Sequence, residues 1–310
     1  MMKQTRIANE IERALRENRP VVALETTLIS HGLPYPANIE TALDCARAIS
    51  EQGAAAATIG IVEGQPTIGL NRNELEAFAT GKEILKVNRS NLAAAIVQGR
   101  WGATTVAATI HLASRAGIKV FSTGGIGGVH RGFSETLDIS SDLTTLTETP
   151  IITVCAGAKA ILDLAKTLEY LETVGVPVVG YNTTEFPAFY TRSSGLELET
   201  VVSSPDEIAQ LAFEHWHLGN RSAVLVAVPI PEEAELAPAE IDRAIEIALE
   251  AAKQAKLAGK AVTPFLLSMV EKLTEGRSLQ ANRALILNNA RVAAQIAVAL
   301  TELEKALDPS

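Results

Sequence analysis

The sequence FSTGGIGGVHRGFSETLDISSD, residues 121–142, combines an apolar start, a glycine-dense turn and a polar segment with one histidine and one arginine. A second segment, IITVCAGAK at residues 151–159, repeats the order of an apolar run and small residues, and ends on Lys159. Each apolar run predicts a strand, and glycines directly after a strand let backbone N–H groups approach an anion closely. The two segments together predict a phosphate site beside an amine that could form an imine.

Strands and helices alternate on both sides of this stretch. Strands are predicted at 20–24, 57–62, 84–87, 118–121, 151–154, 176–180 and 223–228. Helices are predicted at 37–52, 104–115, 239–257, 264–273 and 278–306. We therefore expect an α/β fold with a mainly parallel but mixed central sheet, helices on both faces and a helical C-terminal layer. A turn at residues 63–64 supplies the antiparallel part, and the absence of a linker or internal repeat predicts one domain over residues 1–310.

The composition narrows the class of protein. With 47% hydrophobic but only 4% aromatic residues, aliphatic side chains must build the core, and a net charge of −9 argues against nonspecific affinity for nucleic-acid polymers. Cys45 and Cys155 form no zinc or disulfide pattern, so we predict two buried free thiols. The spacing of Ile7, Ile11 and Leu15 predicts an amphipathic helix rather than a signal peptide. No apolar run reaches the roughly 18 residues of a membrane span, so a cytoplasmic protein without a membrane partner is expected.

Glu25 ends the first predicted strand, within ALETTLISHGLPYP at residues 23–36. The carboxyl ends of strands form the ligand crevice in α/β proteins, and a partly buried carboxyl group there can act as an acid. A helix cap or a salt bridge is the alternative role. His31, in the same proline-bracketed loop, is either catalytic or an organiser of the loop through hydrogen bonds.

Two further polar segments are candidates for anion or cation binding. Lys86 and Arg89 flank the end of a predicted strand, where they form either a phosphate site or a surface pair. Asp138 and Asp142 lie four residues apart with two serines between them, so they either ligate a hard cation such as Mg²⁺ or Mn²⁺ or cap a helix. The TGGIGG turn has the wrong spacing for a dinucleotide fingerprint.

Lys159 and Asn282 stand out because their polar groups lie in apolar surroundings. A lysine among small residues at a predicted helix start is unfavourable unless it has a partner or a function. The alternative is an ordinary lysine whose amine reaches solvent. Asn282 lies in an apolar helical stretch, where it either hydrogen-bonds an amide-like base edge or packs between helices. The aromatic residues Phe186, Phe189 and Tyr190 line a pocket or belong to the core.

Eight segments in register resemble the pseudouridine-5′-phosphate glycosidase family over nearly the whole chain. These segments are VALETTLISHGLPYP, GATTVAAT, FSTGGIGGVHRG, DISSDL, VCAGAK, TLEYLETVGVPVVGY, TPFLL and NNA. The resemblance implies reversible cleavage of the C–C glycosidic bond of pseudouridine 5′-phosphate, giving uracil and ribose 5-phosphate. It also implies a homotrimer.

The same resemblance assigns roles to individual residues. It implies that Lys159 forms an imine with C1′ of the ring-opened sugar, that Glu25 is the proton donor, and that Asp138 binds one Mn²⁺ ion per subunit. The further substrate contacts are expected to be Lys86, Val106, Ser140, Ser141, Asp142, His130 and Asn282. A carbon leaving group explains the need for an imine, because protonation of a heteroatom cannot release it.

Two positions depart from the family pattern, and two other functions remain alternatives. Val228 stands where the family usually has asparagine in NPIPE, and Glu275 stands where a second glycine is usual. Both departures bear on substrate affinity. The alternatives are a lyase that acts on another phosphosugar through the same imine and a noncatalytic phosphosugar or nucleotide sensor.

Overall fold

The computed structural model describes residues 5–255, 257 and 262–307, and in this part of the chain eleven strands form one sheet. The strands are β1 (Arg6–Ile7), β2 (Val21–Leu24), β3 (Ala55–Val62), β4 (Gln65–Ile68), β5 (Leu85–Val87), β6 (Gly102–Thr104), β7 (Val120–Ser122), β8 (Ile152–Cys155), β9 (Val178–Tyr181), β10 (Thr200–Val202) and β11 (Val224–Ala227). Their order is β1-β4-β3-β2-β7-β8-β11-β9-β10, and β6 joins β5 to β3. Among the described strands only β3–β4 and β3–β6 pair antiparallel. The mainly parallel, mixed sheet is confirmed.

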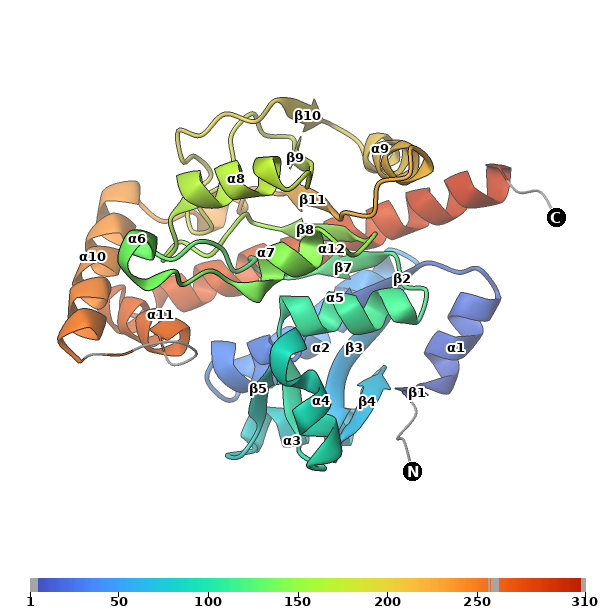
Figure 1. The fold of residues 1–310 in the computed structure, drawn as a ribbon, viewed down its shortest axis with the longest axis horizontal. Helices are drawn as coiled ribbons and strands as arrows, with labels where there is room; N and C mark the ends of the chain where they lie inside the picture. The colour runs from blue at the N-terminus through green and yellow to red at the C-terminus, as the bar shows by residue number, and fades with distance from the viewer. Residues whose placement is uncertain (1–4, 256, 258–261, 308–310) are drawn as a thin grey trace.

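Helices cover both faces of the sheet (Figure 1). They are α1 (Asn9–Arg16), α2 (Ala37–Glu51), α3 (Arg72–Thr80), α4 (Arg89–Val97), α5 (Val106–Arg115), α6 (Phe133–Thr136), α7 (Ser141–Leu146), α8 (Leu164–Thr173), α9 (Pro205–His217), α10 (Pro238–Gln254), α11 (Val262–Leu273) and α12 (Arg277–Leu307), with a π-helical turn η1 (Leu28–Gly32) and a 3₁₀ turn η2 (Glu232–Ala234). Helices α5 and α7 pack together on one face, whereas α12 crosses the other face against β2, β7 and β8. The predicted helical C-terminal layer is thus present as α10 to α12.

The centre of the sheet is built from short aliphatic strands. Every residue of β2, β7, β8 and β11 is buried, as expected for parallel strands covered on both faces. Many small residues on the buried side of α12, including Ala290, Ala293 and Ala294, let this helix lie close to the strands. Its length and hydropathy would suffice to cross a membrane, but 61% of its most apolar window is buried inside the molecule. Such burial is typical of the core helix of a folded protein.

Several local predictions need correction. Ile7 belongs to β1, where it pairs with Ile68, so the N-terminal helix includes Ile11 and Leu15 but not Ile7. Residue Thr104 ends β6, and the predicted helix begins only at Val106, because a three-residue strand gives no recognisable alternation. The hairpin turn at residues 63–64 is confirmed, and both cysteines are free and buried.

Candidate active site

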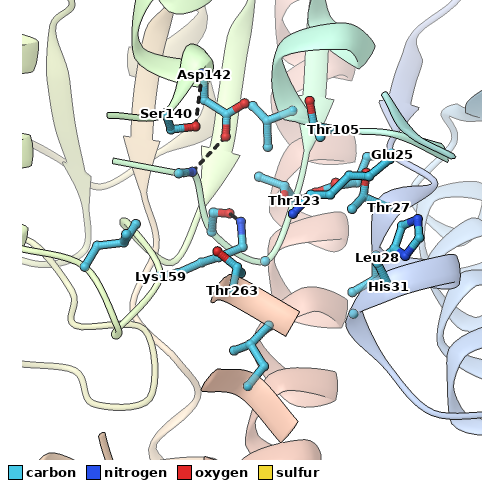
Figure 2. Close-up of a pocket in the computed structure, with 18 of the residues that line it drawn as sticks. Glu25, Thr27, Leu28, His31, Thr105, Thr123, Ser140, Asp142, Lys159 and Thr263 are labelled. Atoms are coloured by element: carbon cyan, nitrogen blue, oxygen red, sulfur yellow. Dashed lines mark hydrogen bonds between the residues drawn. The ribbon is translucent and has the colours of Figure 1, made fainter. Parts of the chain in front are cut away.

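A pocket of about 250 Å³ opens where β2, β7 and β8 end at their carboxyl edge. Parallel strands place this edge beside the loops that usually carry ligand sites. The ten residues to which the resemblance assigns roles all line this pocket, namely Glu25, Lys86, Val106, His130, Asp138, Ser140, Ser141, Asp142, Lys159 and Asn282. Segments as distant as β2 and α12 therefore converge on one site (Figure 2).

Lys159 is held by the glycine-rich turn that follows β7. The Lys159 backbone N–H donates to Ile126 O over 3.0 Å, so the pairing of β7 with β8 continues past both strand ends. The Lys159 Nζ donates to Gly125 O over 2.6 Å. The residue at 157 must be glycine, since its φ of +81° favours glycine and a Cβ there would lie 2.4 Å from Pro187 O. The amine is fixed at the pocket wall.

Glu25 lines the same pocket with intermediate exposure, and Thr123 orients its carboxyl group. The Thr123 Oγ1 donates to Glu25 Oε1 over 2.6 Å. Burial raises the pKa of Glu25 above its usual value, while the positive charge of Lys159 and the Thr123 hydrogen bond lower this pKa in part. A carboxyl group in such surroundings keeps its proton to higher pH than usual, as a general acid must.

Asp142 braces the pocket from within. Its Oδ1 accepts from Ala107 N–H over 2.9 Å, and its Oδ2 accepts from Gly127 N–H over 2.8 Å. A Cβ at Gly127 would lie 2.2 Å from Ser140 Oγ, so only glycine fits there. Figure 2 shows the bonds of Asp142 to Ser140 and to the turn. The N–H of Gly127 is therefore already bonded to a protein carboxylate. A phosphate bound at the predicted glycine-rich site would have to use other groups.

Lys86 lies on β5 and lines the pocket, where its charge affects several neighbouring groups. Lys86 acts electrostatically on Glu25, on His31 and on His130. Burial lowers the pKa of His130, and Asp138 opposes this shift. Arg89, by contrast, pairs with Glu148 over 2.5 Å outside the pocket lining, so the surface-pair interpretation holds for it.

The donor set near Asp138 suits a hydrated cation rather than a protein-enclosed one. The described residues contain no group of three or more His, Cys, Asp or Glu side chains arranged to hold a metal ion. Asp138 is 38% exposed, and its Oδ2 lies 3.9 Å from His130 Nδ1. A single accessible carboxylate fits Mg²⁺-like ions, which keep several water ligands and add oxygens from a phosphorylated substrate.

Helix α12 contributes two asparagines with different surroundings. Asn289 is fully buried, and its Nδ2 donates to Thr123 O over 2.8 Å, so it supports the turn that orients Glu25. Asn282 lines the pocket, and its buried Oδ1 has no hydrogen-bond partner among the described residues. Sequence reasoning missed the support from Asn289 and the role of Thr123, although both lie in the segments NNA and FSTGG that carry the resemblance.

The two departures from the family pattern lie outside the pocket lining. Val228 is buried, and its N–H donates to Cys155 O over 2.8 Å, which extends the pairing of β11 with β8. Glu275 adopts a φ of +52°, a left-handed conformation that a glycine would take without strain.

Comparisons with known proteins agree with this geometry. A family model described as Indigoidine synthase A like protein matches residues 10–299. A curated protein named pseudouridine-5′-phosphate glycosidase, from Caldanaerobacter subterraneus subsp. tengcongensis, is 55% identical over 299 residues, covering 96% of this chain and 97% of that protein. A protein of the same name from Petrotoga mobilis is 52% identical, covering 94% and 95%. The solved structure of the prealnumycin C-glycosynthase AlnA in complex with ribulose 5-phosphate matches with a TM-score of 0.91 at 40% identity, over 98% of this chain and 99% of that one.

Proposed function

This chain belongs to the pseudouridine-5′-phosphate glycosidase family, and on that premise we propose that it cleaves pseudouridine 5′-phosphate reversibly to uracil and ribose 5-phosphate. The observation that carries the proposal is the arrangement of Lys159 and Glu25. An amine held by Gly125 O and a carboxyl group of raised pKa line one pocket. This pair can supply the nucleophile and the proton that cleavage of a C–C glycosidic bond requires.

The proposed reaction uses the lysine nitrogen as an electron source. The Lys159 amine adds at C1′ as the C1′–O4′ bond opens, and the ring oxygen takes a proton. The nitrogen lone pair then forms the C1′=N bond while the C1′–C5 bond breaks, and C5 of uracil takes a proton from Glu25. Water adds to the protonated imine and releases ribose 5-phosphate, and the proton that the lysine nitrogen then loses returns to Glu25, which restores the free amine and the acid. One water molecule is consumed overall.

Binding energy from the phosphate would hold C1′ against Lys159. The pocket offers a phosphate the cation of Lys86 and the polar side chains of His130, Ser140 and Ser141. Asp142 helps to hold this part of the pocket, because its N–H donates to Ser140 Oγ. Contacts remote from the reacting bond are an effective source of positioning. We assign the phosphate to this side, beside Val106 at the start of α5.

We further propose one Mn²⁺ ion per subunit with Asp138 as its protein ligand. The ion would neutralise substrate charge and order water molecules in the pocket. A homotrimer located in the cytoplasm completes the proposal. The mass of the native particle by light scattering tests the trimer, and metal analysis of wild-type protein and Asp138→Asn tests the ion.

The decisive experiment is release of uracil from pseudouridine 5′-phosphate, measured with and without Mn²⁺. Wild-type protein should release uracil, and borohydride should trap ribose 5-phosphate on Lys159. The complex of AlnA with ribulose 5-phosphate favours one second candidate, a lyase acting on another phosphosugar through the same imine. Trapping without uracil release would support that candidate, and binding without either would support a noncatalytic sensor.

A further inference from the structure

His31 occupies an unusual position directly after the strand that carries Glu25. It lies in η1, a π-helical turn in which Leu33 N–H donates to Leu28 O over 3.2 Å. Single π-helical turns are rare and frequently occur at functional sites. Figure 2 shows that this turn carries His31 and Leu28 at the pocket wall beside Glu25.

One ring nitrogen of His31 lacks the partner that its burial demands. The Nε2 atom is buried and has no hydrogen-bond partner among the described residues. The Ile84 backbone lies close enough to the ring to oppose part of the pKa shift that burial causes, but it does not satisfy Nε2. A buried polar atom without a partner destabilises the folded state, so native structures contain few of them. A ligand that reaches Nε2 would remove this cost.

The chemistry of Nε2 limits what that ligand can be. A neutral imidazole carries its proton on one nitrogen, and the tautomer with the proton on Nδ1 leaves Nε2 as an acceptor. Burial and the charge of Lys86 keep the pKa of His31 below its usual value, which keeps the ring neutral. A bare lone pair repels a phosphate dianion, so the partner of Nε2 must be a neutral donor such as a ring N–H or a hydroxyl group.

The surroundings of His31 favour a planar base over a sugar. Turn η1 packs against α11, and Leu28, Pro264 and Leu267 line this part of the pocket with apolar groups. The hydroxyl groups of Ser140 and Ser141 lie on a different element, at the start of α7. A flat base buried against aliphatic side chains still needs acceptors for its N–H groups.

We infer that His31 Nε2 accepts a hydrogen bond from a ring N–H of uracil and so helps to select the base. This inference rests on the proposed function. It adds a neutral acceptor on η1 to the acceptor that Asn282 offers from α12.

Two substitutions test the contact in the synthesis direction, with ribose 5-phosphate and uracil as substrates. His31→Phe keeps the ring shape but removes the acceptor, and we expect it to raise the KM for uracil about 10- to 100-fold. His31→Gln restores an acceptor near the position of Nε2 and should recover most of the loss. Trapping of ribose 5-phosphate on Lys159 by borohydride should stay within about twofold of wild type in both variants.

The outcomes separate this inference from the proposed function. An unchanged KM for uracil in an active His31→Phe variant overturns the inference, and so does weaker trapping of ribose 5-phosphate, which would place the contact on the sugar. Wild-type protein that traps ribose 5-phosphate but forms no pseudouridine 5′-phosphate overturns the proposed function instead.

A spectroscopic measurement on wild-type protein keeps the inference testable if a variant fails to fold. The chain has five histidines, which makes their ¹⁵N resonances separable. The Nε2 resonance of His31 should shift when uracil is added to protein that holds ribose 5-phosphate, and should stay in place with ribose 5-phosphate alone. A shift with the sugar alone, or none with uracil, contradicts the inference.

Discussion

Two groups of polar atoms in the pocket differ in how completely they are hydrogen-bonded. The first, the Asp142 brace, consists of Asp142 with its donors Ala107 and Gly127, and both of its carboxylate oxygens are paired. The second, the unpartnered group, consists of His31 Nε2, Thr105 Oγ1 and Asn282 Oδ1, which are buried without partners among the described residues. Paired atoms stabilise the fold, whereas unpartnered atoms weaken it until a ligand arrives. The difference separates groups that build the site from groups that wait for substrate.

Replacing the amine of Lys159 should give the largest effect. Lys159→Ala should reduce uracil release by at least about 10⁴-fold, because no other group supplies the imine nitrogen. Within the described part of the chain the Lys159 amine hydrogen-bonds only Gly125 O, so the melting temperature should change little. Lys166→Ala, at an exposed lysine on α8, is the matched control and should keep full activity. Residual imine trapping in Lys159→Ala would contradict the assignment.

Replacing the acid should give the next largest effect and a change in pH dependence. Glu25→Gln should lower kcat about 10²- to 10⁴-fold. In wild type, activity that needs protonated Glu25 should fall as pH rises through the raised pKa, and the variant should lose this limb. Exposed Glu10→Gln is the control and should keep the wild-type profile.

The same substitution predicts a stability change whose sign follows from the raised pKa. Burial penalises the charged form, so the stability that protonated Glu25 provides is fully present below the unfolded-state pKa and is lost as pH rises through the folded-state pKa. Glu25→Gln has no charge to bury. Its melting temperature should therefore exceed that of wild type more at pH 8 than at pH 5. An equal difference at both pH values would contradict the buried-acid interpretation.

Disturbing the Asp142 brace should lower both stability and activity. Asp142→Asn presents an amide NH₂ to one of two N–H donors, so at least one hydrogen bond is lost and a buried donor is left unpaired. We expect a loss of about 1–3 kcal/mol in the free energy of unfolding, measured in urea. The KM for ribose 5-phosphate should rise as the turn shifts. Asp242→Asn, on the exposed side of α10, should change neither quantity.

Removing an atom of the unpartnered group should have the opposite effect on stability. Thr105→Val deletes an unpartnered hydroxyl group and keeps the shape, so stability should stay unchanged or rise by up to about 1 kcal/mol. Thr274→Val is the matched control, because the Thr274 Oγ1 donates to Val270 O over 2.8 Å, and it should lose about 1 kcal/mol. Equal losses of stability in Thr105→Val and Thr274→Val would contradict the distinction between paired and unpartnered atoms.

A substitution outside both groups sets the baseline. Glu275→Gly should raise the free energy of unfolding by about 0.5–1 kcal/mol, because glycine adopts the positive φ at this position without strain. Activity should not change, since Glu275 does not line the pocket. A measurable change in KM would mean that the backbone conformation just before α12 affects substrate binding in the pocket.

The sequence predicted the sheet well because its central strands are continuous aliphatic runs. The strand predicted at 151–154 and the observed β8 differ by one residue at each end. Strands β1, β6 and β10 are too short to show a pattern, and their pairing depends on distant partners. Local reasoning therefore finds the buried centre of the sheet, including the three-residue strand β7, and misses β1, β6 and β10. That the chain forms one domain stays a prediction.

The candidate site was predictable as a set of residues but not as a network. The resemblance brought Lys159, Glu25 and Asp138 together, and the structure gathers them in one pocket. The engagement of Gly127 N–H by Asp142 and the support of Thr123 by Asn289 depend on contacts across 15 and 166 residues of sequence. No local pattern encodes such contacts. The roles themselves await the experiments above.

The course of α12 has a consequence for biosynthesis. This helix covers β2, β7 and β8 and anchors the β7 turn through Asn289. Until the ribosome has made α12, that face of the sheet is uncovered. Thr123, which donates to Glu25, then lacks its hydrogen bond from Asn289. The nascent protein must pass through a stage with an exposed aliphatic surface and no working catalyst. We expect the protein to depend on chaperones during translation, and we expect a chain that is truncated just before Asn289 to aggregate strongly.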